Sequence, residues 1–176
     1  GRRRIAVRTE KRRQGDSAAC LDIYNYYILN SCHTLEEEPL TEEQFSRRVA
    51  QISERYPHLV ARDDGGRVVG YAYLDVFNER SAYRATADLS IYVHHDSRGA
   101  HVGGAMLAAL EALAPAYGID TLISIITDKN EGSVRFHEHH GFVREGWLHD
   151  VACKFGEHVG VFFYRKALPG AASATD

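Results

Sequence analysis

Seven consecutive residues, Arg98-Gly-Ala-His-Val-Gly-Gly104, bring a cation, an imidazole and three glycines together. The stretch before them predicts a strand over 86–93, and the leucines after them predict a helix that extends to Leu113. A glycine-rich loop between a strand and a helix binds anions, because its backbone N–H groups point outward and the helix dipole favours negative charge. The segment therefore predicts a site for a phosphate-bearing ligand.

Histidines gather at two other places, at His94 and His95 and at His137, His139 and His140. Imidazoles that share a helix face can bind a metal ion. Neither group is accompanied by a cysteine pair or an HExxH motif, and cations are favourable near the end of a helix. We therefore expect no metal, and we expect His139 and His140 to be surface residues near a helix end.

Hydrophobic periodicity predicts elements in the order β-α-α-β-β-β-α-β-α-β-β. The expected strands lie at 5–9, 58–62, 67–77, 86–93, 121–126, 142–149 and 158–165, and the expected helices at 17–30, 41–56, about 99–113 and about 131–140. Asp16 or Ser17 can cap the first helix, and Thr41-Glu-Glu-Gln44 is a capping box for the second. The apolar run TLISII at 121–126 is typical of a strand buried on both faces. This order predicts an α/β domain with a mixed sheet.

Length and composition indicate one globular domain. The chain has 176 residues, of which 44% are hydrophobic and 26% charged, and a chain of this length buries about 70% of its unfolded surface. These values exclude two large domains and a disordered chain. We expect an extension at 1–4, the domain at 5–168 and a flexible tail at 169–176.

Charge and cysteine usage limit the partners and the compartment. The formal net charge is −3, so no basic excess indicates nucleic acid as a partner. No run of 18 apolar residues occurs, so we expect no membrane-spanning helix. Cys20, Cys32 and Cys153 are few and widely spaced, which is typical of reduced thiols. The sequence therefore predicts a cytoplasmic protein.

Several short phrases resemble one enzyme superfamily and follow its order along the chain. Residues 98–103 resemble the Arg/Gln-x-x-Gly-x-Gly/Ala pyrophosphate loop of the GNAT acyltransferases, with His101 at a glycine position. Within that superfamily the sequence is most similar to the phosphinothricin acetyltransferase type. The other phrases are IYNYYI at 23–28, EP at 38–39, RYPHLV at 55–60, VGYAY at 69–73, RSAY at 80–83, YV at 92–93, SVRFHE at 133–138 and GF at 141–142.

The resemblance implies the GNAT fold, a mixed and mostly antiparallel β-sheet with flanking helices and a central pair of strands that splay apart. It also implies that acetyl-CoA is the co-substrate and that its pantetheine lies between the splayed strands. The implied acetyl-CoA-binding residues are Ile91, Tyr92 and Val93 on the strand, Arg98, Gly99, Ala100, His101, Val102, Gly103 and Gly104 in the loop, and Asn130 after the TLISII strand.

The resemblance further implies direct attack by a primary amine, with two proton carriers. A protonated alkyl amine has no lone pair and must first lose a proton. The family has a Glu for this step on the strand before the loop, and the matching residue here is Asp88. The family's acid position, seven residues past Asn130, is His137, and an imidazole can donate a proton to the departing thiolate.

The acceptor side departs from the family pattern. Arg80 and Tyr83 lie on the loop that would form one wall of the acceptor pocket. Glu36 stands where the family has an Arg, which implies a pocket of changed charge preference, unless the segment is a solvated acidic turn. Val159-Gly-Val161 replaces the family's His-Asp-Val. We therefore expect the acceptor to be an amino-acid-like metabolite or antibiotic other than phosphinothricin.

Two alternatives remain open at this point. Asp88 is one methylene shorter than the family's Glu and His101 replaces a glycine, so one alternative is a GNAT-fold protein that binds a ligand without acetyl transfer. The other is a biosynthetic enzyme that uses another acyl-CoA or none. The family often forms dimers, and the aromatic helix with Tyr24, Tyr26 and Tyr27 is compatible with a homodimer.

Overall fold

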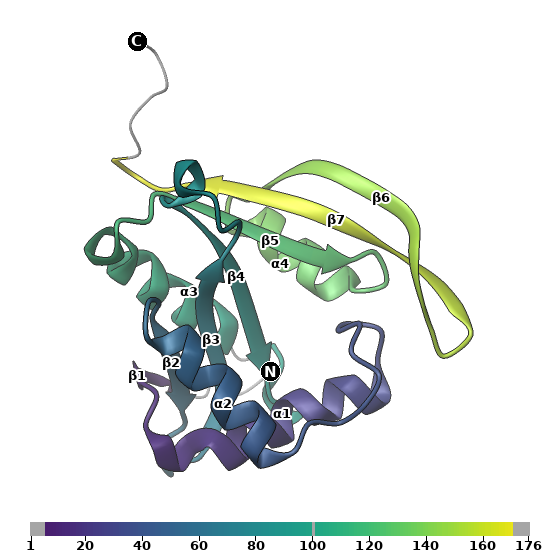
Figure 1. Cartoon of the computed structure of the whole chain (residues 1–176). Coiled ribbons are helices and arrows are strands. Elements are labelled where there is room, and N and C mark those ends of the chain that lie inside the picture. Colours follow the sequence, from purple (N-terminus) through teal and green to yellow (C-terminus); the bar gives the residue numbers. More distant parts are fainter. Residues whose placement is uncertain (1–5, 100, 171–176) are drawn as a thin grey trace.

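The computed structural model describes residues 6–99 and 101–170, which form one sheet with helices on both faces (Figure 1). The strands are β1 (Arg8–Lys11), β2 (His58–Arg62), β3 (Val68–Val76), β4 (Thr86–Val93), β5 (Thr121–Thr127), β6 (Val143–Lys154) and β7 (Glu157–Ala167). The helices are α1 (Ser17–Asn30), α2 (Glu42–Ser53), α3 (Val102–Leu113) and α4 (Glu131–His139), with short 3-10 turns η1 (Gln14–Asp16), η2 (Ser81–Tyr83), η3 (His95–Ser97) and η4 (Ala114–Tyr117). The predicted order of strands and helices is confirmed. The expected extension at 1–4 and most of the expected tail lie outside the described residues.

The sheet is mixed and mostly antiparallel, as predicted. Its strands follow the order β1-β2-β3-β4-β5-β7-β6, and β4 and β5 form its parallel pair. These two strands pair only between 86–88 and 121–123. Beyond that point β4 stays on β3 while β5 stays on β7. The central strand pair therefore opens, which confirms the predicted splay.

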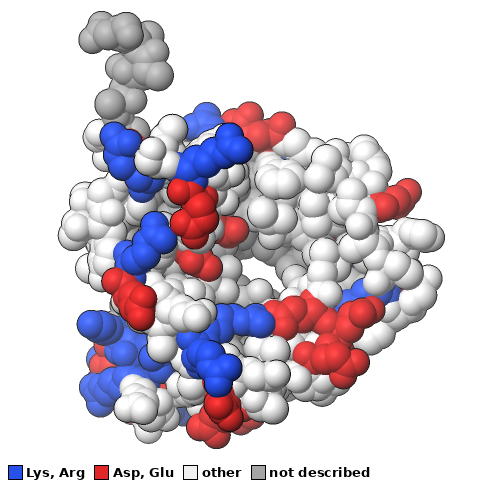
Figure 2. All heavy atoms as spheres, in the orientation of Figure 1, with Lys and Arg blue, Asp and Glu red and all other residues white. Residues whose placement is uncertain are grey.

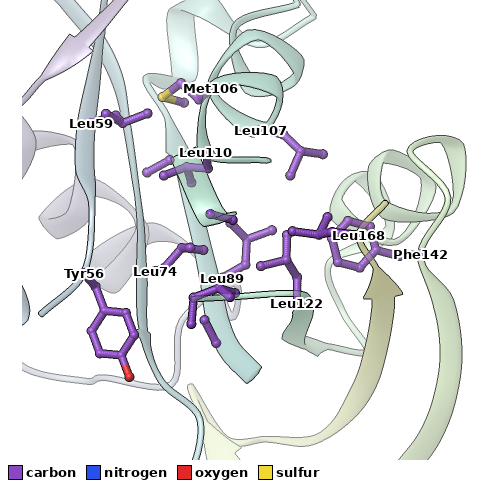
Figure 3. Packing of buried hydrophobic residues seen from close by; sticks show 14 of the residues in the cluster. Tyr56, Leu59, Leu74, Leu89, Met106, Leu107, Leu110, Leu122, Phe142 and Leu168 are labelled. Atoms are coloured by element: carbon purple, nitrogen blue, oxygen red, sulfur yellow. The ribbon is translucent and has the colours of Figure 1, made fainter. Parts of the chain in front are cut away.

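The two faces of the sheet carry separate hydrophobic clusters. Met106, Leu107 and Leu110 of α3 pack on leucines of β3, β4 and β5 (Figure 3), and α4 joins this cluster through partly buried side chains. On the other face, α1 and α2 pack on β2 and β3 around Tyr71. Strand residues alternate between the faces. Because Ala87 and Leu89 point toward α3, Asp88 lies on the opposite face.

Local sequence signals set several boundaries. The capping box is confirmed, since the Gln44 N–H donates to Thr41 Oγ1 at 3.1 Å and the Thr41 N–H donates to Gln44 Oε1 at 2.9 Å. Asp16 precedes α1 but its side chain does not cap the helix. Instead, both Asp16 oxygens accept from Arg62 at 2.7 and 2.8 Å. The Asp16 carboxylate therefore forms an ion pair with Arg62 of β2 instead of capping α1.

Two strand predictions need correction. The first strand runs over Arg8–Lys11 rather than 5–9, where it pairs with β2. The prediction that β5 is buried on both faces is wrong, because Ile125 is 47% exposed. Leu122, Ser124 and Ile126 are buried on the α3 side, whereas the helices on the other face pack on β2, β3 and β4.

Within residues 6–99 and 101–170, no helix has the length and apolarity needed to cross a membrane.

Candidate active site

The opening between β4 and β5 forms a cleft of about 870 Å³. Its walls come mainly from β4, the loop residues 97–99 and 101, the first turn of α3, β5 and α4. The cleft brings together Ile91, Tyr92, Val93, Arg98, Gly99, His101, Val102, Gly103, Gly104, Asn130 and His137. Ala100 lies outside the described residues. Residues far apart in the sequence, predicted to share a site, therefore line one cavity.

The edge of β4 that faces the cleft offers free backbone groups. From Leu89 to Val93, β4 pairs with β3 and not with β5. Backbone N–H and C=O groups that lack a ladder partner must find another partner or water. The Tyr27 hydroxyl of α1 donates to the Val93 carbonyl and so ties the C-terminal end of β4 to α1. An extended ligand with amide groups can therefore pair along this edge.

The loop before α3 places a helix N-terminus at the cleft. His101 is the N-cap residue and has left-handed backbone angles, φ 62° and ψ 18°. Its side chain caps none of the first N–H groups of α3, so these groups remain available to an anion. A Cβ on Gly103 would lie 3.2 Å from the Phe136 ring. That glycine therefore lets α4 pack closely against the first turn of α3.

Asn130 and Arg98 flank the cleft from its two sides. Asn130 is the N-cap of α4, where its Oδ1 accepts from the Ser133 N–H at 3.1 Å. This leaves the amide N–H₂ of Asn130 for other partners. The Arg98 guanidinium lies 5.6 Å from the centre of the Tyr27 ring, a distance compatible with a cation–π contact.

Asp88 lies directly opposite Asp75 in the β3–β4 ladder. It is half-buried on the face away from α3. Burial raises the pKa of Asp88 to about 7, and the negative charge of Asp75 contributes to the same shift. A carboxyl with that pKa accepts and releases a proton near neutral pH, which suits a general base.

His137 is buried and held at both ring nitrogens. Its Nδ1 lies 2.8 Å from the Ser133 carbonyl, and its Nε2 lies 2.9 Å from Ser124 Oγ. Because a carbonyl can only accept, Nδ1 carries the proton and Nε2 accepts from the Ser124 hydroxyl. Burial lowers the pKa of His137 to about 4, although the Ser133 carbonyl opposes the shift. The resting imidazole is therefore neutral.

The residues predicted for the acceptor side have other contacts. Glu36 accepts from Tyr24 at 2.6 Å and from Arg48. Burial alone would raise the pKa of Glu36, but these hydrogen bonds outweigh it and the pKa lies below its usual value. Arg80 and Tyr83 are exposed on the β3–β4 connection and do not line the β4–β5 cleft. The charge of Glu36 is thus matched within the protein.

The structure adds two polar residues that sequence reasoning missed. Ser124 is 2% exposed, donates to His137 Nε2 and lines the cleft together with it. Asp75 faces Asp88. Ser124 interrupts the apolar strand expected at 121–126, and Asp75 interrupts the one expected at 67–77. A polar residue inside an apolar strand is the signal that could have identified them.

One histidine group has atoms close enough together to bind a metal ion. His94, His95 and Asp96 have ligand atoms within 4.8 Å of one another. The Arg67 guanidinium, however, lies 3.0 Å from His94 Nε2, and the Asp96 N–H donates to His94 Nδ1 at 3.1 Å. Both nitrogens of His94 are therefore engaged, and the site has a positive charge beside it.

Comparisons with known proteins agree with this geometry. The family model described as acetyltransferase (GNAT) domain matches residues 11–161. This chain belongs to the GNAT acetyltransferase family. It is 32% identical to a phosphinothricin N-acetyltransferase of Streptomyces viridochromogenes over 151 residues, 86% of this chain and 82% of the relative. An L-methionine sulfoximine/L-methionine sulfone acetyltransferase of Pseudomonas aeruginosa is also 32% identical, over 90% of this chain and 93% of its own.

A solved GNAT structure supports the same assignment. The phosphinothricin acetyltransferase of Sinorhizobium meliloti in complex with AcCoA has a TM-score of 0.91 and 31% identity, covering 97% of this chain and 92% of that one. The predicted family and fold are therefore confirmed, and the protein is a GNAT-type acetyltransferase.

The segment Val159-Gly-Val161 departs from the family's His-Asp-Val, and at Gly160 the structure gives a steric reason for this departure. A Cβ on Gly160 would lie 2.5 Å from the Leu148 carbonyl oxygen and 2.6 Å from Asp128 Oδ2. The Gly160 N–H also donates to Asp128 Oδ1 at 3.1 Å. In this GNAT domain, position 160 therefore has no room for a side chain.

Proposed function

We propose that the protein transfers an acetyl group from acetyl-CoA to the primary amine of a small amino-acid-like metabolite or antibiotic by direct attack. The observation that carries the proposal is the opened β4–β5 cleft, which meets a helix N-terminus at one end. Pantetheine amides would pair with the free edge of Ile91–Val93. The pyrophosphate would bind the N–H groups of the 98–104 loop and Arg98, and Asn130 would contact the arm of the co-substrate.

Asp88 and His137 are the proposed proton carriers. Asp88 takes a proton from the ammonium group, the freed lone pair forms the C–N bond, and the C–S bond breaks. The departing thiolate then needs a proton. In the proposed acid role His137 acts beside Ser124: both residues line the cleft, and the Ser124 hydroxyl donates to His137 Nε2. The neutral imidazole has no proton at Nε2, so the proton comes from the attacking nitrogen, which loses a second proton as the amide forms; Nε2 takes it up and passes it to the thiolate.

Calorimetric titration with acetyl-CoA tests the proposal first. We expect micromolar binding, and a ligand at 100 times its Kd should raise the free energy of unfolding by about 2.7 kcal/mol. CoA release on addition of primary amines tests the transfer step. Absence of binding at millimolar acetyl-CoA would contradict the proposal. Binding without CoA release from any amine would favour a ligand-binding GNAT domain.

His101→Gly should strengthen both folding and acetyl-CoA binding. The left-handed backbone of His101 costs a residue with a Cβ about 1 kcal/mol relative to glycine, and its side chain lines the cleft where the pyrophosphate would bind. We expect a higher melting temperature and a lower Kd. His101→Ala is the matched control, since it removes the imidazole but keeps the backbone cost. Weaker binding by both variants would show instead that the imidazole donates to a phosphate.

The proposal includes a homodimer in the cytoplasm. Trp147, Leu148 and Val151 are exposed on β6, the edge strand of the sheet. Exposed apolar side chains on an edge strand are typical of an interface. Light scattering that gives the mass of one chain would contradict the dimer.

In the described residues Cys20, Cys32 and Cys153 are free thiols, which is compatible with a reducing compartment.

A further inference from the structure

A histidine at the end of α4 lies beside the N-terminus of α3. His140, expected at the surface, is half-buried and lines the cleft together with the start of α3. A Cβ on Gly104, in the first turn of α3, would lie 3.4 Å from Cε1 and 3.5 Å from Nε2 of the His140 ring. These are van der Waals distances, so the imidazole is packed directly against that turn.

Two neighbouring glycines let the end of α4 approach α3 this closely. The Phe136 ring is packed against Gly103 and the His140 ring against Gly104. The two rings also contact each other, with 4.5 Å between their centroids, as expected of side chains four residues apart on a helix. The imidazole is therefore held in place between Phe136 and the first turn of α3.

The same turn offers backbone donors to an anion. The helical hydrogen bonds of α3 begin with the Ala105 N–H, which donates to the His101 carbonyl at 3.1 Å. The N–H groups of residues 102–104 precede that bond and point out of the helix end. An anion that binds these N–H groups would therefore lie next to the His140 ring.

The ring nitrogens of His140 are open to such a ligand. Within residues 6–99 and 101–170, the histidine side chains that form hydrogen bonds are those of His94 and His137. Charges elsewhere give a phosphate little attraction, because the formal net charge is −3 and Figure 2 shows basic and acidic side chains interspersed over the face that it draws. Binding of a phosphate group therefore depends on local donors in the cleft.

The groups around His140 favour a neutral imidazole when no ligand is bound. Burial lowers the pKa of His140 most, His139 and Lys166 lower it further, and Glu111 opposes them. Lys166 and Glu111 bind each other at 2.6 Å, so the effects of their charges largely offset. An anion bound beside the ring would favour the imidazolium and raise the pKa of His140.

We propose that the His140 imidazole donates a hydrogen bond to the pyrophosphate of acetyl-CoA, and that acetyl-CoA binds more tightly as His140 takes up a proton. The inference rests on the proposed function, which puts the pyrophosphate at the 98–104 loop. A charged donor binds a phosphate oxygen about twice as strongly as a neutral one. His140 is thus a further binding residue for the co-substrate, and through it the pH sets the affinity.

The direction of the pH dependence follows from the proton uptake. Because the bound phosphate raises the pKa of His140, the complex holds a proton that the free protein lacks between the two pKa values. The added affinity is fully present below the pKa of the free protein, and it is lost as the pH rises through the pKa of the complex.

The choice of ligand removes a competing titration. The 3′-phosphate of acetyl-CoA also titrates in this range, because the second pKa of a phosphate monoester is about 6. In 3′-dephospho-CoA the monoester is absent and the pyrophosphate is kept. A pH dependence seen with 3′-dephospho-CoA therefore belongs to the protein.

Calorimetric titration with 3′-dephospho-CoA at pH 6 and pH 8, at constant ionic strength, tests the inference. We expect the Kd of the parent protein to be about tenfold lower at pH 6, the worth of one charged hydrogen bond. Titrations in buffers of different ionisation enthalpy should show that protons are taken up on binding. His140→Phe keeps the packing on Phe136 and should lose both the Kd ratio and the proton uptake.

Two further variants separate titration from packing. His140→Gln keeps an N–H donor that does not titrate, so its Kd at pH 8 should stay within about threefold of the parent value while the pH ratio disappears. His158→Phe replaces an exposed histidine of β7 and is the matched control, which should keep the ratio. Melting temperatures of the variants show whether the packing is intact.

Each outcome separates the inference from the proposed function. If the parent has no pH ratio, or if both His140 variants keep it, the inference is overturned and the proposed function stands. If acetyl-CoA shows the ratio and 3′-dephospho-CoA does not, His140 binds the 3′-phosphate and its assignment to the pyrophosphate is overturned. If neither compound binds at millimolar concentration, the proposed function fails as well.

Discussion

Asp88→Asn is expected to lower kcat by about 10²- to 10⁴-fold while the Kd for acetyl-CoA stays unchanged. The substitution preserves the size of the side chain and removes its basicity, so the loss reports general-base catalysis. Asp88 does not line the β4–β5 cleft, although its neighbours Leu89 and Ser90 do. Co-substrate binding is therefore expected to survive, and calorimetry with acetyl-CoA measures it directly.

The pH profile gives a sharper test of the same assignment. Because the base must be ionised, kcat/KM for the amine should rise tenfold per pH unit up to the pKa of Asp88, about 7. Above that pH it should be flat until the amine loses its own proton, near pH 10.4 for a lysine-like amine. Asp88→Asn should lose the plateau and rise continuously toward that pKa, because only amine already free in solution can attack.

Two further variants complete the experiment. Asp88→Glu restores a carboxylate and should recover much of the lost rate. His137→Phe should lower kcat without moving the limb near pH 7, because burial holds the pKa of His137 at about 4. A parent profile that rises steadily through pH 9 would remove Asp88 from the mechanism. An unchanged kcat in His137→Phe would remove the proposed acid.

Features that depend on local sequence were predictable. Periodicity identified the order of strands and helices, since each element has to bury one face. The capping box at Thr41 and Gln44 lies within one turn of helix, so its outcome did not depend on distant residues. The glycine-rich segment at 98–104 was identified as a strand-to-helix connection for the same reason, and its described residues line the cleft.

Features that depend on pairing between distant elements were not predictable. Asp16 or Ser17 was expected to cap α1, but Arg62, 46 residues beyond Asp16 along the chain, binds the Asp16 carboxylate. Ile125 is exposed because α1 and α2 cover β2, β3 and β4 but do not extend over β5. Hydrophobic periodicity does not show how far a helix covers a sheet. The juxtaposition of Asp75 and Asp88 depends on the register of β3 on β4. Pattern analysis finds the strands but not their register.

His58→Phe is expected to stabilise the protein at neutral pH. His58 is 3% exposed and its ring is stacked on those of Tyr71 and Tyr73, at 5.7 and 5.1 Å between centroids. Among the described residues, neither ring nitrogen has a hydrogen-bond partner. A buried polar group without a partner costs about 1 to 3 kcal/mol, and phenylalanine keeps the stacking without that cost. Urea denaturation at pH 7 should show a higher free energy of unfolding.

The same variant should be less sensitive to acid. Burial, with a contribution from Arg12, lowers the pKa of His58 to about 3 in the folded protein, against about 6.5 unfolded. Between those values the unfolded chain binds a proton that the folded chain does not. The titration of His58 therefore takes nothing from the free energy of unfolding above pH 6.5 and lowers it by about 1.4 kcal/mol per pH unit as the pH drops toward 3.

Differences between variants isolate these contributions from the other titrating groups. His137 has the same sign, since its folded pKa is also low. Asp88 has the opposite sign, because a folded pKa of about 7 lets the folded state bind a proton that the unfolded chain lacks between pH 7 and about 4. Between pH 6 and 5, the slope of unfolding free energy against pH should thus be about 1.4 kcal/mol per unit smaller in His58→Phe than in the parent.

Asp88→Asn should shift this slope by the same amount in the other direction, because it removes a group that resists acid. The exposed His158→Phe is the surface control and should change the unfolding free energy at pH 7 by less than about 0.5 kcal/mol. Equal slopes in the parent and in His58→Phe would mean that the buried imidazole has a partner after all. Opposite shifts would show that burial has opposite effects at the two sites. Burial of His58 lowers the free energy of unfolding in acid, and burial of Asp88, which raises the pKa of the proposed base, offsets part of that loss.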